Sequence, residues 1–165
     1  MVFRVAGGIA GSAAFVTGNY AMFVSTANQP NGGATTANLV ALDTNIRSSN
    51  INNNAGVMTF TGAGIYHIIS ELSFTSTAGA NPTISTWLTQ NGQNVAYTTQ
   101  DFQLLGGANT VQLSTCSFIL NVANNDNAAV YWACSDTRVS LAYQAALTSP
   151  TRPASPSAMV SITQV

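Results

Sequence analysis

Residues 65–74, with the sequence IYHIISELSF, are the stretch that decides the predicted fold. Their side chains alternate with the period of two that is typical of a β-strand. One face carries Tyr66, Ile68, Leu72 and Phe74, and the other carries Ile65, His67, Ile69 and Glu71. A strand that is largely apolar on both faces is normally covered on both. A single β-sandwich covers one face, so we expect a second subunit to cover the other.

The rest of the chain from Tyr20 onward repeats this period in short runs separated by turn residues, a pattern typical of an all-β sandwich. Asn91-Gly92 is a strong hairpin signal between two such runs. Residues 48–54 and 150–157 are rich in Asn, Ser or Pro and are predicted to be loops. Further strands are expected at residues 20–25, 39–42, 57–60, 83–89, 94–98, 111–122, 130–134, 138–143 and 158–165.

The chain of 165 residues carries very little charge: Lys and Arg number 4, Asp and Glu number 5, and together they make up 5% of the residues. Roughly 25% is usual in a soluble domain. Without a basic surface we expect no binding to nucleic acid, and no polybasic segment exists to hold an anionic membrane. One histidine, two cysteines and five scattered acids do not make a dense metal site. We therefore expect neither a metal nor a cofactor.

Several short motifs follow one another in an order that is more specific than an all-β pattern. Gly64-Ile65-Tyr66 opens a strand that ends in Leu72-Ser73-Phe74, and Trp87-Leu88 precedes Asn91-Gly92. Residues 118–122, a polar turn, Val130-Tyr131-Trp132 and a terminal strand after a Pro-Ser loop follow. In this order the motifs resemble the tumour necrosis factor-like jelly rolls, especially the complement-type globular heads, versions of which also occur in bacteriophage structural proteins. The resemblance covers residues 20–165 and implies a ten-stranded, two-sheet jelly-roll β-sandwich that assembles as a homotrimer.

The resemblance also implies which residues meet at the subunit contacts. The face of the strand that carries Ile65 would point to the three-fold axis, and the last strand would place Val160 and Ile162 in the core. The trimer interface that follows consists of Ile65, His67, Ile69, Glu71, Tyr131, Met159, Ser161, Thr163 and Val165. His67 and Glu71 are four residues apart, roughly 13 Å along a strand, which is too far for a pair within one chain. A hydrogen-bonded interface pair is favoured over a metal or anion site on the axis and over a pH switch.

Residues 1–19 are rich in Gly and Ala and are predicted to be an extended N-terminal arm in front of the jelly-roll domain of residues 20–165. An extended arm of this length reaches about 60 Å. It carries little charge, which suits a segment that becomes ordered on a partner. Its apolar anchors for a capsid would be Val2, Phe3, Val5, Ile9, Phe15 and Val16.

Residues for catalysis or for tight ion binding are scarce. Three serines, Ser70, Ser73 and Ser76, lie near His67 in sequence, but a nucleophile needs a base and an orienting acid in one cleft. Four of the five acids fall at separate loops: Asp43, Asp101, Asp126 and Asp136. We therefore expect no enzyme. Complement-type heads usually carry Gly-Asp before the strand that holds Val130, whereas this chain has Asn127-Ala128, so a calcium site is not expected there.

Cys116 and Cys134 both fall on strand faces that are predicted to point into the core. Two buried free thiols are the favoured state, because cysteine often serves as a small buried apolar residue. A disulfide across the sandwich is the alternative.

Two functions from different classes fit these observations. The first is a virion structural protein: a homotrimeric capsid decoration (cement) protein that binds the major capsid protein on the outer surface of a bacteriophage head after assembly in the host cytoplasm. The alternative is a receptor- or carbohydrate-binding tip module of a tail fibre, or a secreted complement-like lectin. Exposed loop aromatics and amides such as Tyr97, Phe102 and Asn52-Asn53-Asn54 would serve that second function.

Overall fold

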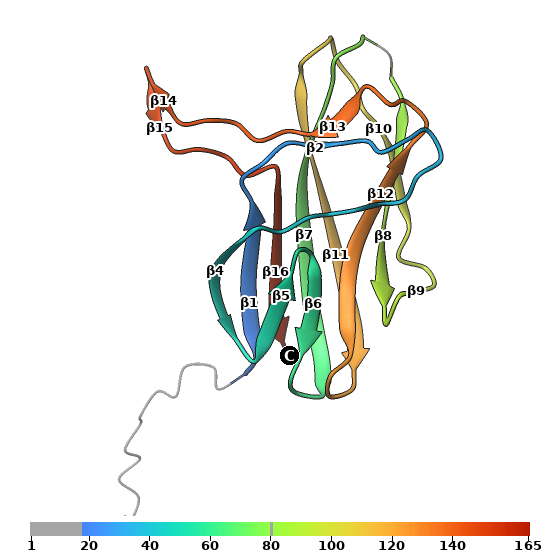
Figure 1. Cartoon of the computed structure of the whole chain (residues 1–165), viewed down its shortest axis with the longest axis vertical. Coiled ribbons are helices and arrows are strands. Elements are labelled where there is room, and N and C mark those ends of the chain that lie inside the picture. The colour runs from blue at the N-terminus through green and yellow to red at the C-terminus, as the bar shows by residue number, and fades with distance from the viewer. Residues whose placement is uncertain (1–17, 80) are drawn as a thin grey trace, which may run out of the picture.

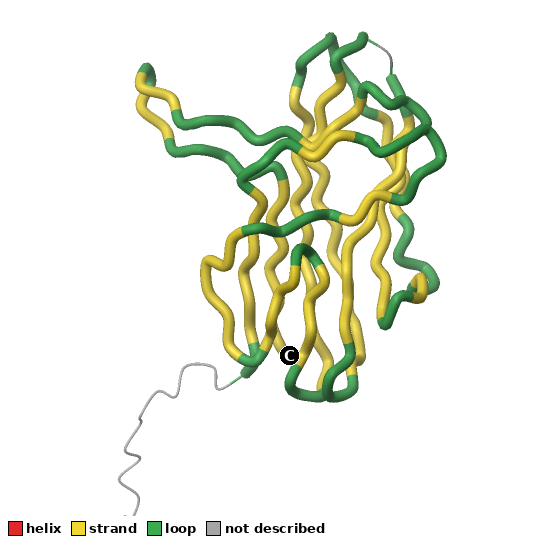
Figure 2. Tube along the Cα trace, viewed as in Figure 1, coloured by secondary structure: helices red, strands yellow, loops and turns green. Residues whose placement is uncertain are grey.

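The computed structural model describes residues 18–79 and 81–165, which form strands and loops without a helix (Figure 2). All six predicted anchors of the arm lie outside these residues. Asn19, which we placed in the arm, belongs to the packed domain, because it is buried and its Nδ2 donates to the Tyr66 hydroxyl over 2.6 Å. The first strand then begins at Tyr20.

The strands form two antiparallel sheets that face each other as a sandwich (Figure 1). In the first sheet β11 lies along one edge of β7, while β16 and β13 follow each other along the opposite edge. β1 and β4 continue the sheet beyond β16, and β2 pairs with β13. This first sheet comprises β1 (Tyr20–Ser25), β2 (Gln29–Pro30), β4 (Thr44–Ser49), β7 (Gly64–Ser76), β11 (Val111–Val122), β13 (Val139–Leu141) and β16 (Ala158–Gln164).

The second sheet has the order β10-β8-β12-β6-β5, with β3 paired to β12 and β9 paired to β8. Its strands are β3 (Asn38–Leu39), β5 (Ile51–Asn54), β6 (Val57–Phe60), β8 (Thr83–Gln90), β9 (Gln93–Asn94), β10 (Gln100–Gln103) and β12 (Asn127–Cys134). A separate hairpin of β14 (Leu147–Thr148) and β15 (Thr151–Arg152) projects away from the sandwich (Figure 1). An all-β, two-sheet jelly-roll sandwich was the prediction, and this architecture confirms it.

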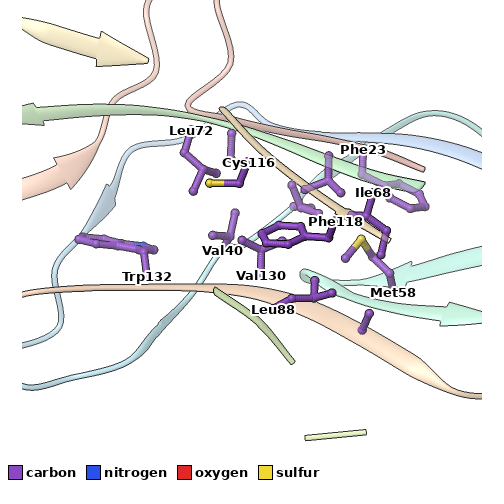
Figure 3. Packing of buried hydrophobic residues seen from close by; sticks show 14 of the residues in the cluster. Phe23, Val40, Met58, Ile68, Leu72, Leu88, Cys116, Phe118, Val130 and Trp132 are labelled. Carbon is purple, nitrogen blue, oxygen red and sulfur yellow. The ribbon is translucent and has the colours of Figure 1, made fainter. Parts of the chain in front are cut away.

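The core fills the space between the sheets with the inward side chains of both (Figure 3). Tyr66, Ile68, Leu72 and Phe74 on β7 are fully buried, as their alternation predicts. Phe74 meets Trp132 of the opposite sheet edge-on, with ring centroids 5.3 Å apart. Val160 and Ile162 are also core residues, as expected from the last strand.

Four local predictions were wrong. Of the strand expected at residues 39–42, only Leu39 belongs to a strand, the two-residue β3. Residues 48–54 are not a loop but the end of β4 and the whole of β5, which turn about Asn50 at a φ of 58°. Polar Asn residues fit there because β5 buries only Ile51, opposite Phe60 of β6. The predicted loop of residues 150–157 contains β15. Of the strand expected at residues 94–98, only Asn94 is a strand residue, at the end of β9.

The number of strands also differs from the ten that were predicted. The described residues contain sixteen strand segments, of which ten have four residues or more. The six shorter ones are two- and three-residue pairings along loops, and a hydrophobic period cannot reveal pairings as short as these.

Gly56 closes the turn between β5 and β6 at a position where a side chain has no room. Its φ is +106°, and a Cβ there would lie 2.1 Å from the backbone oxygen of Val40. Gly56→Ala is therefore expected to destabilise the fold by more than about 1 kcal/mol. Denaturant unfolding followed by circular dichroism measures this, with Gly92→Ala as a control, since its φ of +75° is also positive but a Cβ there meets nothing within 4 Å. Equal losses in the two variants would show that φ alone, and not the Val40 contact, sets the cost.

Candidate functional site

The outward face of the first sheet is formed by side chains of β11, β7, β16 and β1 that point away from the core, and we call it the β7 face. The strand register arranges these side chains in rows across the sheet. One row runs Ile119, His67, Thr163, Tyr20; the next runs Ser117, Ile69, Ser161, Met22; a third runs Thr115, Glu71, Met159, Val24. Ile65 lies beyond the first row, next to Val165, whose backbone N–H donates to the Ile65 carbonyl over 3.0 Å.

The β7 face exposes large apolar side chains to solvent in the single chain. Ile119 is 71% exposed, Leu113 58%, Ile65 48% and the terminal Val165 73%. Large apolar side chains left in water on one face of a sheet are typical of a contact with another molecule. The face is therefore the strongest candidate interaction site of the chain.

Eight of the nine predicted interface residues belong to this face and its end. Four come from β7, three from β16, and Val165 follows β16 directly. Tyr131 does not join them, because it lies on β12 of the second sheet and points outward on the opposite side of the sandwich. Sequence reasoning missed Ile119 and Leu113, although the alternation of β11 gives the same signal as that of β7.

Two hollows adjoin the end of the β7 face that carries the third row, with Val24, Glu71 and Met159. The larger has a volume of about 380 Å³ and is lined almost entirely by apolar groups, among them Met22, Val24, Met159 and Pro156. A second hollow of about 150 Å³ lies between Glu71, Leu113 and Met159. Both are lined in part by residues 154–156 of the loop that precedes β16, so the face is uneven rather than flat.

His67 makes a contact that the sequence did not reveal. Its Nε2 lies 2.7 Å from the Oγ of Ser117 on the neighbouring strand β11. Within the described part of the chain, the Glu71 carboxylate makes no hydrogen bond and no ion pair, so it does not orient the imidazole. A histidine and a serine on an open sheet face, without an acid beside them, do not form a catalytic triad.

Three of the remaining carboxylates are held by local hydrogen bonds. Side-chain donation from Asn91, together with the N–H of Ala123 and the amide of Gln90, lowers the pKa of Asp126. These donors engage both carboxylate oxygens of Asp126. Burial raises the pKa of Asp43, but hydrogen bonds from Thr44, Thr26 and Ser25 outweigh burial and the net pKa is lowered.

Asp136 is the most strongly perturbed acid of the described chain. The Arg138 guanidinium donates to it over 2.7 Å, and this hydrogen bond, with the N–H of Arg138, lowers the pKa of Asp136 to about 2. The pair lies on the exposed turn between β12 and β13. Both of its charged groups bond to each other, and their role is to hold the conformation of this turn.

These three acids make a pH-dependent prediction. Their pKa is lower in the folded chain than the ordinary value of 3.8, so the unfolded chain binds more protons below that pH. The stability they contribute is present above about pH 4 and is lost as the pH falls toward about 2. Thermal unfolding between pH 2 and pH 7 should show the midpoint falling in that window. Asp126→Asn should show a smaller fall relative to its own neutral value, and an unchanged fall would contradict the assignment.

Cys116 and Cys134 are both free and buried, as favoured from the sequence. The Sγ of Cys116 lies 3.1 Å from the Thr86 hydroxyl between the sheets, and burial raises the pKa of the Cys134 thiol. Both thiols therefore belong to the core.

Residues 18–79 and 81–165 contain neither a metal-binding cluster nor a membrane-spanning helix. They hold no group of three or more His, Cys, Asp or Glu that would bind a metal ion. Because none of them is helical, none forms a helix that crosses a membrane.

The strand order and the register define a jelly-roll fold of the kind found in tumour necrosis factor-like and complement-type domains. Three solved structures share this fold. The globular domain of zebrafish complement 1qA protein matches with a TM-score of 0.52 at 9% identity, over 90% of this chain and 96% of that one. Murine APRIL matches with TM-scores of 0.55 at pH 8.0 and 0.59 at pH 5.0, at 12% and 7% identity, over 90% of this chain and 99% of that one. No protein-family model and no curated protein matches the sequence.

Proposed function

We propose that this chain is a non-enzymatic structural protein that assembles as a homotrimer through the β7 face. The observation that carries the proposal is the face itself, which leaves Ile119, Leu113 and Ile65 in water when the chain is alone. Burying apolar surface gains roughly 25 cal/mol per Å², and closing three copies around an axis buries it in each copy. The resemblance to the complement-type heads supports the same assembly.

A cyclic trimer brings two different surfaces of each subunit together, because its interfaces are heterologous. Residues nearest the axis, such as Ile69 and His67, would meet their own copies. Residues at the margins, such as Met22 and Met159 around the large hollow, would meet a different part of the neighbour. Tyr131 lies on the far side of the sandwich, so we place it outside the interface in this proposal.

We further propose that the trimer decorates the outer surface of a virion capsid by binding the major capsid protein. Supporting this, the chain combines low overall charge with extensive neutral surface, and charges are costly to desolvate in a contact. The β14–β15 hairpin supplies a projecting element whose residues 145–151 are all exposed and available to a partner (Figure 1). Binding to several capsid subunits at once would stabilise the assembled shell by mass action.

Two measurements test the two levels of the proposal separately. Light scattering of the full chain at micromolar concentration should give three times the chain mass of 17.1 kDa, and a monomer would overturn the trimer. Antibody raised against the full chain should label the heads of virus particles from the source that encodes it, as seen by electron microscopy. Labelling of tail tips, or recovery of the protein only from a secreted fraction, would overturn capsid decoration in favour of a fibre tip or a secreted lectin.

A further inference from the structure

The outward face of the second sheet has a different chemistry from the β7 face. In the described chain, none of the large hydrophobic side chains exposed to solvent lies on a strand of the second sheet. An aromatic pair lies there instead: Trp87 of β8 and Tyr131 of β12 are directly opposite in the register and stack with ring centroids 6.0 Å apart at 19°. Both rings are only partly buried, so they present aromatic surface to solvent.

The indole of this pair is held in place by a second strand. Trp87 Nε1 donates to the side-chain oxygen of Asn94 on β9 over 3.0 Å. This bond satisfies the indole N–H and fixes the ring relative to Tyr131. A rigid aromatic surface loses little conformational freedom when a ligand packs on it.

A hollow of about 270 Å³ lies beside the aromatic pair on the same two strands. Ser85 precedes Trp87 by two residues, and Ala133 follows Tyr131 by two. Residues two apart on a strand point to the same side of the sheet, so the lining residues Ser85 and Ala133 are the neighbours of the aromatic pair on this face. The hollow is lined by four hydroxyl side chains: Thr35, Thr83, Ser85 and Ser135. None of the four hydroxyls makes a hydrogen bond to another part of the described chain.

A carboxylate lies next to these hydroxyls. Asp101 of β10 is directly opposite Ser85 in the register, which places both side chains on the same side of the sheet. Of the five acidic side chains in the described chain, only the carboxylates of Asp101 and Glu71 make neither a hydrogen bond nor an ion pair within it. A free carboxylate beside free hydroxyls offers acceptors and donors to a polar ligand.

We infer that this face binds an uncharged sugar of a glycan chain, with the ring against Trp87 and Tyr131 and its hydroxyls in the hollow. The C–H groups of one side of a pyranose ring form an apolar patch that packs on an aromatic ring, while its hydroxyls both donate and accept hydrogen bonds. Four neutral hydroxyls and one carboxylate match that pattern, and no cation is present in the hollow to favour phosphate or sulfate. A protein partner would find little exposed apolar surface on this face.

The test is binding of the full chain to an array of neutral oligosaccharides of glucose, galactose, mannose and N-acetylglucosamine, with sulfated glycans alongside. We expect binding to a neutral glycan and none that requires sulfate. Trp87→Ala and Tyr131→Ala should each raise the Kd at least tenfold, and Asp101→Asn at least threefold. Thr59→Ala is the matched control, because Thr59 lies on β6 of the same sheet, opposite Asn127, and does not line the hollow, so its Kd should stay within twofold.

A fluorescence measurement tests directly whether the bound sugar contacts Trp87. The chain has two tryptophans, and Trp132 is buried in the core, so in the Trp132→Phe variant all tryptophan emission reports on Trp87. The bound sugar should protect this emission from quenching by acrylamide.

Three results would overturn the inference. They are a folded chain that binds no neutral glycan, a Trp87→Ala variant that binds as well as the parent, and a Tyr131→Ala variant that dissociates the assembly. The last result would mean that the aromatic pair is a subunit contact. The inference does not depend on the trimer, because a monomer that binds the sugar through Trp87 would overturn the proposed assembly and leave this site intact.

Discussion

Ile69→Glu is expected to convert the assembled protein into monomers, with the mass from light scattering falling from three times to one times 17.1 kDa. Ile69 lies in the middle row of the β7 face, between Ser117 and Ser161. A glutamate there places a charge in the proposed contact, two residues from the carboxylate of Glu71 on the same face. Three copies around an axis add like-charge repulsion to the cost of desolvation, which is several kcal/mol per ion.

The matched control is Thr59→Glu, which places the same carboxylate on the outward face of the second sheet. Thr59 lies on β6 opposite Asn52 and Asn127, away from the β7 face. Its mass should remain that of the parent, and the circular dichroism spectra of both variants should match the parent spectrum. An Ile69→Glu variant that keeps the parent mass would show that the β7 face is not the subunit contact.

The alternation of residues 65–74 was enough to predict the most important feature of the fold. β7 runs from Gly64 to Ser76, buries the predicted side of the strand and leaves the predicted opposite side in contact with solvent. The prediction succeeded because side chains on a strand alternate strictly between its two faces, and because β7 is long enough for the alternation to be clear. The same period correctly predicted the whole of β11 and the inward residues of β16.

The sequence could not show which strands are neighbours. For this reason it did not predict the contacts between strands, either on the β7 face or at the aromatic pair of the second sheet. Ser117 lies 50 residues from His67 in the chain and meets it through the β7–β11 register. Trp87 and Tyr131 were noted separately, but their stacking depends on the pairing of β8 with β12. Residues 48–54 were misread because polar side chains on an edge strand lack the hydrophobic period that identifies strands.

Trp132→Ala is expected to cause the largest loss of stability among substitutions in the core, about 3–5 kcal/mol. Trp132 is the largest of the fully buried side chains and packs edge-on against Phe74 of the opposite sheet. Its removal opens a cavity that two facing sheets cannot close without moving apart. In a domain of this size the loss corresponds to a fall of about 6–20 °C in Tm, measured by calorimetry.

Trp132→Phe separates the ring from its N–H group. The Nε1 of Trp132 is buried, and no hydrogen-bond partner for it exists among the described residues. A buried donor without a partner costs about 1–3 kcal/mol, so replacing indole by phenyl removes a penalty while it gives up part of the packing. We therefore expect Trp132→Phe to lose less than half as much stability as Trp132→Ala. A loss equal to that of the alanine variant would show that the indole N–H stabilises the core, and that a partner such as a buried water molecule accepts from it.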